Sequence, residues 1–508
     1  MTRRQGAILN TIAAFSNEIV SIVAGFIVPR IILSAFGSNV NGLVTSIAQF
    51  LGFVSLLEAG VGAVIKSSLY KPLASGDTVE LSCVLKSSQR FFRAIAYVLI
   101  VYTLVLVVVF PLLINNQFGF LYTGSLILII SASLFSQYYF GITNQLLLIA
   151  DQKAYIPLFL TVSAIVLNTI ACIVVVRLGG GIHSVRIATA VFFTIKPILL
   201  FLYVRSHYSI DPKVIYDKEP IKQKWNGLAQ HIAMLGQDNA PAIILTMFSS
   251  LANVSIYGVY ILVINGIRQL INTINSSIGP IMGELIAKKE NDTLNNMFSL
   301  MEWGLHNIIV VLYTVTGLLI VPFVLVYTSG VFDTDYNVPL FALFLTLAGA
   351  LRSLQLCYNI LIQAAGLFKE TQTASFIELF LNIGVSILLV LRYGLVGVAI
   401  GMSVALCYRL LYFVIFLSKN VLRRSISCFV RQVAVDFVII GLIIVSCSWL
   451  PQGIDSYWVF FYKGAITLSI ATSICLAVNM VLYRSNVRSI LKYLSLRMED
   501  KKNVSQSR

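Results

Sequence analysis

Long apolar runs alternate along the chain with short segments that hold glycine, proline, asparagine or charged residues. Each run is long enough for a transmembrane helix, which needs about 20 mostly apolar residues. The pattern predicts about fourteen spans and therefore an all-α polytopic membrane protein. The predicted spans are 11–33, 43–65, 91–114, 121–148, 155–176, 182–204, 227–249, 254–278, 304–327, 338–363, 373–391, 395–417, 431–450 and 458–482.

Lysine and arginine gather on one side of this pattern. Of the 36 in the chain, 27 fall in or next to the N-terminal segment, every second connection and the C-terminal segment, whereas four fall in or next to the opposite loops and the other five lie inside spans. Short loops rich in positive charge stay on the cytoplasmic side during insertion. The distribution predicts that both termini are cytoplasmic.

Composition agrees with this pattern, because 58% of the 508 residues are hydrophobic and 11% are charged, against about 25% charged in soluble proteins. The net charge of +15 is spread over many cytoplasmic segments, which predicts contact with membrane lipids and no nucleic-acid partner.

The seven cysteines and four histidines form no C-x-x-C and no ligand-spaced pair. Neither a metal site nor a cofactor is predicted, apart from a coupling ion, H⁺ or Na⁺.

No motif for enzymatic chemistry is present. The chain has no Walker loop, no G-x-S-x-G and no H-E-x-x-H, and its short outward loops leave no domain that could hold an acceptor. Asp333 and Asp335 have the spacing of a metal-binding D-x-D. A solvated turn is the simpler interpretation, because no third carboxylate or histidine lies nearby in the sequence. We therefore predict a protein that is not an enzyme.

An internal repeat is visible at an offset of about 212 residues, where PRIILSAF (29–36) matches PAIILTMF (241–248). The outward turns RLGGG (177–181) and RYGLV (392–396) match at nearly the same offset. Spans one to six then correspond to spans seven to twelve, both starting in the cytoplasm, as in transporters built from parallel repeats. The predicted divisions are a first lobe at 1–204, a cytoplasmic linker at 205–226, a second lobe at 227–417, an extra span pair at 431–482 and a basic cytoplasmic tail at 483–508.

Three early stretches, VPRIILSAFGSNVNGLVTSIAQFL (28–51), SLLEAGVG (55–62) and LYKPLA (69–74), resemble the start of bacterial polysaccharide-export proteins. These are the O-antigen and capsule flippases of the multidrug/oligosaccharidyl-lipid/polysaccharide exporter superfamily. GLVGVAIG (394–401) is also similar to a stretch found there. The resemblance implies a V-shaped, two-lobed fold in the bacterial cytoplasmic membrane. It also implies movement of an undecaprenyl-diphosphate-linked oligosaccharide to the outer leaflet, for lipopolysaccharide or capsule biosynthesis alongside a polysaccharide polymerase.

Ionisable residues inside spans mark candidate pathways, because each costs several kcal/mol in a bilayer unless it is paired or faces water. Arg268 lies about 20 Å along its predicted span, at 1.5 Å per residue, and Arg352 is similarly central. Lys196 is moderately deep, whereas Arg30 is near an outer end and can snorkel. These four cations suit the diphosphate of such a cargo. The amides predicted to accept sugar hydroxyls are Asn17, Gln237, Asn239 and Asn275.

Three acidic residues, Asp238, Glu18 and Glu58, are the candidates for binding a coupling ion. The alternative for each is a structural role, in which the acidic side chain pairs with a buried arginine and holds helices together.

Two further functions stay open for the whole chain. A multidrug cation antiporter of the same fold is disfavoured by the intramembrane arginines and lysine, and a membrane-embedded glycan polymerase or transferase is disfavoured by the short outward loops.

Overall fold

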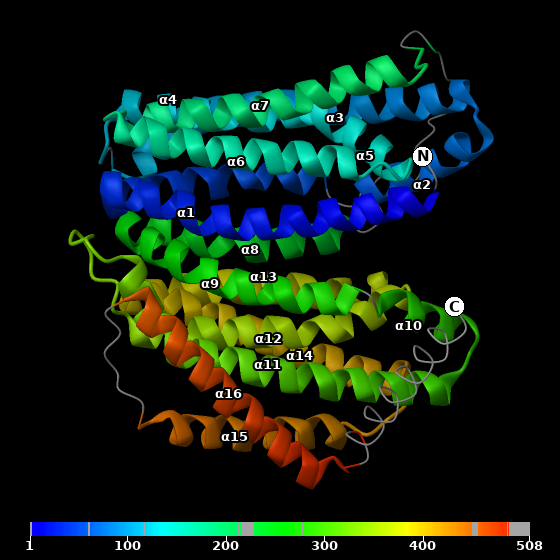
Figure 1. Ribbon diagram of the computed structural model, residues 1–508, viewed down its shortest axis with the longest axis vertical. Helices are drawn as coiled ribbons and strands as arrows, with labels where there is room; N and C mark the ends of the chain where they lie inside the picture. Colours follow the sequence, from blue (N-terminus) through cyan, green and yellow to red (C-terminus); the bar gives the residue numbers. More distant parts are fainter. Residues whose placement is uncertain are drawn as a thin grey trace, which may run out of the picture. The chain divides into compact units, whose positions relative to one another are not determined.

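The structure of the protein is a computed structural model (Figure 1). It describes residues 3–58, 61–115, 117–211, 214, 228–276, 278–449, 456–484 and 486, with side chains for all of these except 3, 4, 228–235 and 273–276. Every regular element in this part of the chain is a helix. In order they are α1 (Arg3–Gly52), η1 (Phe53–Glu58), α2 (Val61–Ser75), α3 (Thr78–Leu113), α4 (Phe120–Ser136), η2 (Gln137–Gly141), α5 (Ile142–Ala150), α6 (Tyr155–Arg177), α7 (Ile182–His207), α8 (Leu228–Phe248), α9 (Leu251–Ser276), α10 (Gly279–Ala287), α11 (Asn291–Tyr327), α12 (Pro339–Ala364), α13 (Phe368–Tyr393), α14 (Leu395–Asn420), α15 (Ser427–Cys447) and α16 (Tyr457–Leu482).

Twelve helical stretches of the described chain are long and apolar enough to cross a membrane. The first, Gln5–Glu58, holds the first predicted span and most of the second, on either side of a break in α1 at Gly37. Helix α8 coincides with the predicted span 227–249 and adds another. The prediction of an all-α membrane protein with about fourteen spans is therefore confirmed.

The break in α1 is fixed by a contact with a distant loop. Gly37 has φ 79° and ψ 176°, a conformation that is essentially restricted to glycine. The backbone N–H of Ser38 donates to Asp333 Oδ2 at 2.7 Å, and the Ser38 hydroxyl donates to Asp333 Oδ1 at 2.6 Å. Asp333 thus caps the start of the second helical half of α1. The predicted solvated turn missed this structural role.

Two of the predicted spans are interrupted where they carry polar side chains. The second span changes from α1 into the short 3-10 helix η1, and α2 begins at Val61. The fourth span contains η2, one π-helical turn between α4 and α5. Single π-helical turns are rare and occur frequently at functional sites.

The chain divides into two compact units, which are described separately. The first comprises Met1–Leu262, Gly330–Asp335 and Lys369–Met402, and the second comprises Val263–Ser329, Tyr336–Phe368 and Ser403–Arg508. The lobe boundaries proposed from the repeat stay a prediction.

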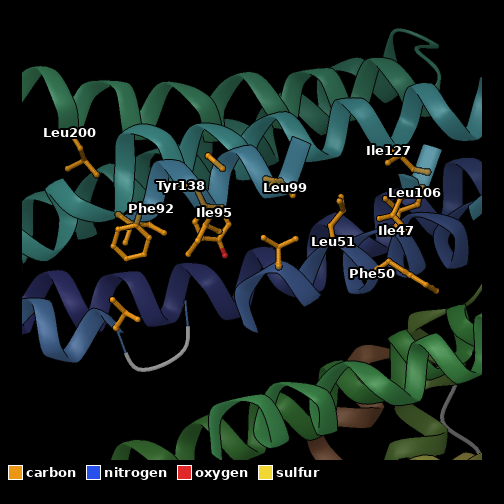
Figure 2. Close-up of a cluster of buried hydrophobic side chains, with 14 of the residues drawn as sticks. Ile47, Phe50, Leu51, Phe92, Ile95, Leu99, Leu106, Ile127, Tyr138 and Leu200 are labelled. Atoms are coloured by element: carbon orange, nitrogen blue, oxygen red, sulfur yellow. The ribbon is translucent and has the colours of Figure 1, made fainter. Parts of the chain in front are cut away.

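The first unit has a continuous apolar core contributed by α1 to α7. Figure 2 shows part of it, where Tyr138 of η2 lies among apolar side chains that include Phe92, Ile95 and Leu99 of α3. Tyr138 is 6% exposed. A tyrosine in such surroundings needs a hydrogen-bond partner for its hydroxyl group, and this requirement becomes important for the site below.

In the second unit, the predicted extra span pair packs on α11. Val310 and Val311 of α11 meet Ile439 and Ile443 of α15 and Ala471 of α16 in one buried cluster. The pair formed by α15 and α16 is therefore an integral part of this unit.

The GLVGVAIG stretch has a structural reason in the hairpin of α13 and α14, which lies in the first unit up to Met402. Gly394 turns the chain with φ 54°. A Cβ atom at Gly397 would lie 2.4 Å from the Leu389 carbonyl oxygen, and one at Gly401 would lie 2.2 Å from Ser386 Oγ. Glycine is required at these positions because the two helices touch through their backbones.

Candidate functional site

Three helices of the second unit meet closely around Gly349 of α12. A Cβ atom at Gly349 would lie 2.8 Å from Ile264 Cγ2 of α9 and 2.7 Å from Tyr313 Cε1 of α11. The Tyr313 hydroxyl group shares a hydrogen bond of 2.8 Å with Ser353 Oγ, one turn further along α12. Tyr313 therefore joins α11 to the face of α12 that meets α9.

Two of the predicted cations, Arg268 and Arg352, follow shortly after the residues that make this contact. A second contact, between Gly279 of α10 and Ile360 of α12, shows that the chain from α9 into α10 follows α12 in the same direction. Arg268 lies four residues beyond the α9 contact residue and Arg352 three residues beyond Gly349, so each is about one helical turn further in the same direction. Both side chains are half-buried, and Arg268 interacts electrostatically with Tyr313. Arg268 and Arg352 therefore each lie about one helical turn beyond the contact of α9 with α12.

Two predicted amides are placed by α8 in the first unit. Gln237 is buried, and its Oε1 accepts a hydrogen bond of 3.0 Å from Asn382 Nδ2 of α13. Asn239 points toward the end of α1, since its Oδ1 would lie 3.4 Å from a Cβ atom at Gly52. Asp238, between them, is half-buried. Asn382 is fully buried, and the sequence analysis did not single it out.

Glu58 lines a cavity of about 270 Å³ in the first unit. Tyr138 of η2 donates a hydrogen bond to the Glu58 carboxylate, and Gln137 Nε2 donates to Gln145 Oε1 at 3.4 Å. The lining residues are Glu58, Leu134, Gln137, Tyr138, Ile142, Gln145 and Leu146. Residues of η1, α4, η2 and α5 thus line one cavity, and its polar side chains come from η1, η2 and α5.

The remaining predicted site residues lie on other helices or have no described side chain. Lys196 on α7 and Arg30, Asn17 and Glu18 on α1 are half-buried. The Asn17 Oδ1 atom is buried without a hydrogen-bond partner. Asn275 lies in α9, and its side chain is outside the described residues.

A polar network in the second unit was not expected from the sequence. Fully buried His306 of α11 forms a 2.5 Å contact through Nδ1 with Asp436 Oδ2 of α15. One turn earlier, Glu302 accepts a hydrogen bond of 2.6 Å from Arg424 Nη2 and another from the Tyr358 hydroxyl group. These contacts tie α11 to α12, to α15 and to the loop before α15.

Comparison with solved structures gives the fold a relative. No sequence-family model and no curated protein sequence matches the chain. The lipid II flippase MurJ in its inward closed conformation matches with a TM-score of 0.71 and 15% identity, over 94% of this chain and 100% of that chain. An inward-facing multidrug resistance MATE family transporter of the MOP superfamily matches with a TM-score of 0.61 and 15% identity, over 78% and 95%. The chain has the MurJ and MATE fold.

A third structure with the MurJ and MATE fold is the eukaryotic MATE transporter AtDTX14, at a TM-score of 0.54 and 15% identity. AtDTX14 matches over 84% of this chain and 99% of its own. The all-α fold predicted from the sequence is therefore confirmed, with the arrangement found in these structures. The neighbours are membrane transporters, and the chain is a multi-pass membrane protein.

Proposed function

We propose that the protein is a flippase that moves an undecaprenyl-diphosphate-linked oligosaccharide from the inner to the outer leaflet of the bacterial cytoplasmic membrane. It would act by alternating access and supply surface-polysaccharide biosynthesis, O-antigen or capsule. Its partners would be the lipid-linked cargo, membrane lipids and the polysaccharide polymerase machinery. Both termini would lie in the cytoplasm, as the lysine and arginine distribution predicts.

The extent of the MurJ match supports this proposal over multidrug export. MurJ, a lipid II flippase by its name, covers 94% of this chain, whereas the MATE structures compared above cover 78% and 84%. A flippase thus corresponds to more of the chain than the multidrug transporters do. The single observation on which the proposal depends is this correspondence along nearly the whole chain.

Two arginines support a cargo that carries phosphate groups. Arg268 of α9 and Arg352 of α12 each lie about one helical turn from the contact between these helices at Gly349, and both are only half-buried. Guanidinium groups bind phosphate oxygens through paired hydrogen bonds and are less strongly hydrated than an ammonium group. Two of them together suit a diphosphate and would repel a cationic drug. A glycan polymerase remains disfavoured because connections such as 178–181 are too short to hold an acceptor.

Substitution of these arginines tests the proposal in cells that need this protein for polysaccharide export. Arg268→Ala and Arg352→Ala should each abolish export at normal protein levels, and Arg268→Lys should keep part of it because one positive charge remains. Arg392→Ala is the control, since Arg392 is exposed at the end of α13 and lies over the Tyr393 ring. Full export by both alanine variants would remove the arginines from the site.

A further inference from the structure

The cavity of the first unit offers hydrogen-bonding groups that the described chain does not use. Glu58 receives one hydrogen bond there, from the Tyr138 hydroxyl group, although an ionised carboxylate can accept about four. The side-chain amides of Gln137 and Gln145 share one long hydrogen bond of 3.4 Å and have no other partner among the described residues. Such groups are costly within a membrane span unless they bind a partner or water. The cavity therefore suits water or a ligand with several hydroxyl groups.

The π-helical turn brings the two amides onto one face of the fourth span. Residues eight apart in a regular α-helix lie about 80° apart around its axis, at 3.6 residues per turn. A π-helical turn accommodates one extra residue, and η2 provides such a turn between Gln137 and Gln145. Their angular separation then equals that of residues seven apart, which is about 20°. The irregular backbone of this span thus places two amides in one cavity.

The size and charge of the cavity define what it can hold. Its volume is about 270 Å³, the space of about nine water molecules at about 30 Å³ each. Sites for drug-sized ligands are larger, at about 300–1,000 Å³, so the cavity has room for one sugar ring and not for an oligosaccharide. Leu134, Ile142 and Leu146 provide apolar walls for the C–H groups of a ring. None of the described lining residues is a lysine, arginine or histidine, and Glu58 would repel an acidic sugar.

The cavity is preformed, because its walls are packed into the first unit. Tyr138 is 6% exposed and lies in the apolar core (Figure 2), from which its hydroxyl group holds the Glu58 carboxylate. A Cβ atom at Gly141, the last residue of η2, would lie 2.9 Å from Pro197 Cβ of α7. The carboxylate and the two amides are only half-buried, so they remain accessible to a ligand. Binding to a preformed site costs little ordering of the protein.

We propose that this cavity binds one neutral or amino sugar ring of the transported saccharide and excludes a ring that carries a carboxylate. The proposal rests on the proposed function, which supplies the saccharide. Glu58 accepts hydrogen bonds from hydroxyl or amino groups of the ring, while the amides of Gln137 and Gln145 donate to and accept from its other hydroxyl groups. Of the amides predicted from the sequence to bind sugar hydroxyls, none with a described side chain lines this cavity.

Saturation-transfer NMR of the purified protein in lipid nanodiscs measures sugar binding without the lipid carrier. The probes are the methyl glycosides of glucose, glucosamine and glucuronic acid, and the wild type should bind the first two but not the third. Gln145→Met keeps the volume of the side chain without its hydrogen bonds and should weaken binding about 2- to 10-fold. Glu58→Gln should admit the glucuronide, a gain that poor folding cannot produce. Gln117→Ala, at an exposed amide before α4, is the matched control and should bind as the wild type does.

The outcomes separate the sugar site from the proposed function. Wild-type protein that binds none of the glycosides would show that the cavity holds water alone and would overturn the site, as would equal binding of all three. Unchanged binding in a Gln145→Met variant that unfolds at the wild-type temperature would also overturn it. Leaflet transfer is then measured in liposomes. Cavity-dependent glycoside binding in a protein that moves no lipid-linked saccharide would refute the proposed function, whereas transfer by a protein that binds no glycoside would refute the sugar site alone.

Discussion

The contact between α13 and α14 gives a prediction whose size follows from the geometry. A Cβ atom at Gly401 would lie 2.2 Å from Ser386 Oγ and 2.7 Å from Ser386 N, so Gly401→Ala must push the two helices apart. Inserting a methyl group into a packed interior typically costs about 1–3 kcal/mol. Alanine recovers up to about 1 kcal/mol through its higher helix propensity. We expect a net loss of about 1–2 kcal/mol.

Gly384 on α13 provides the matched control. It is exposed, and a Cβ atom there meets nothing within 4 Å, so Gly384→Ala should leave stability unchanged or raise it by up to about 1 kcal/mol. Thermal unfolding of the purified variants in detergent, followed by the signal of a thiol-reactive dye, compares them directly. Equal unfolding temperatures for the two variants would refute the close backbone contact.

Three further predictions follow from other contacts. Asp333→Ala removes two hydrogen bonds at the break in α1 and should lower stability by about 1–3 kcal/mol in the same unfolding assay; an unchanged stability would contradict the cap. Arg424→Met leaves Glu302, with a side chain 7% exposed, without its cation and should cost about 3–5 kcal/mol, so well-folded protein at normal yield would argue against this ion pair. In a cysteine-free background, Ser34→Cys should react with an impermeant thiol reagent in intact cells and Lys71→Cys should not; the reverse labelling would invert the predicted topology.

The membrane spans could be predicted because their signal is local. Long apolar runs bounded by charge fix where each helix crosses the bilayer, and α12 and α16 begin within one residue of the predicted spans. The interruptions at η1 and η2 could not be predicted in this way. Gly141, the last residue of the π-helical turn, packs against Pro197 of α7, a contact between residues far apart in the sequence.

The same distinction applies to the candidate site. Arg268 and Arg352 stand out in the sequence because a charge in an apolar run is expensive, but their place near the contact of α9 with α12 depends on how these helices pack. Gln137 and Gln145 carry no charge and resemble many polar side chains in these helices. His306 and Asp436 lie 130 residues apart, and nothing in their spacing indicates that they meet.

Leaflet transfer in liposomes tests the central proposal most directly. The purified protein is reconstituted with an undecaprenyl-diphosphate-linked oligosaccharide that carries a fluorescent label on the sugar, and a membrane-impermeant reductant then destroys the label that is accessible from outside. The proposal predicts that nearly all of the label is lost with the wild type, and that Arg268→Ala behaves like protein-free liposomes, in which only the outer-leaflet label is lost. Wild-type liposomes that protect the inner-leaflet label as well as protein-free liposomes do, while the same preparation exports a cationic dye, would contradict it.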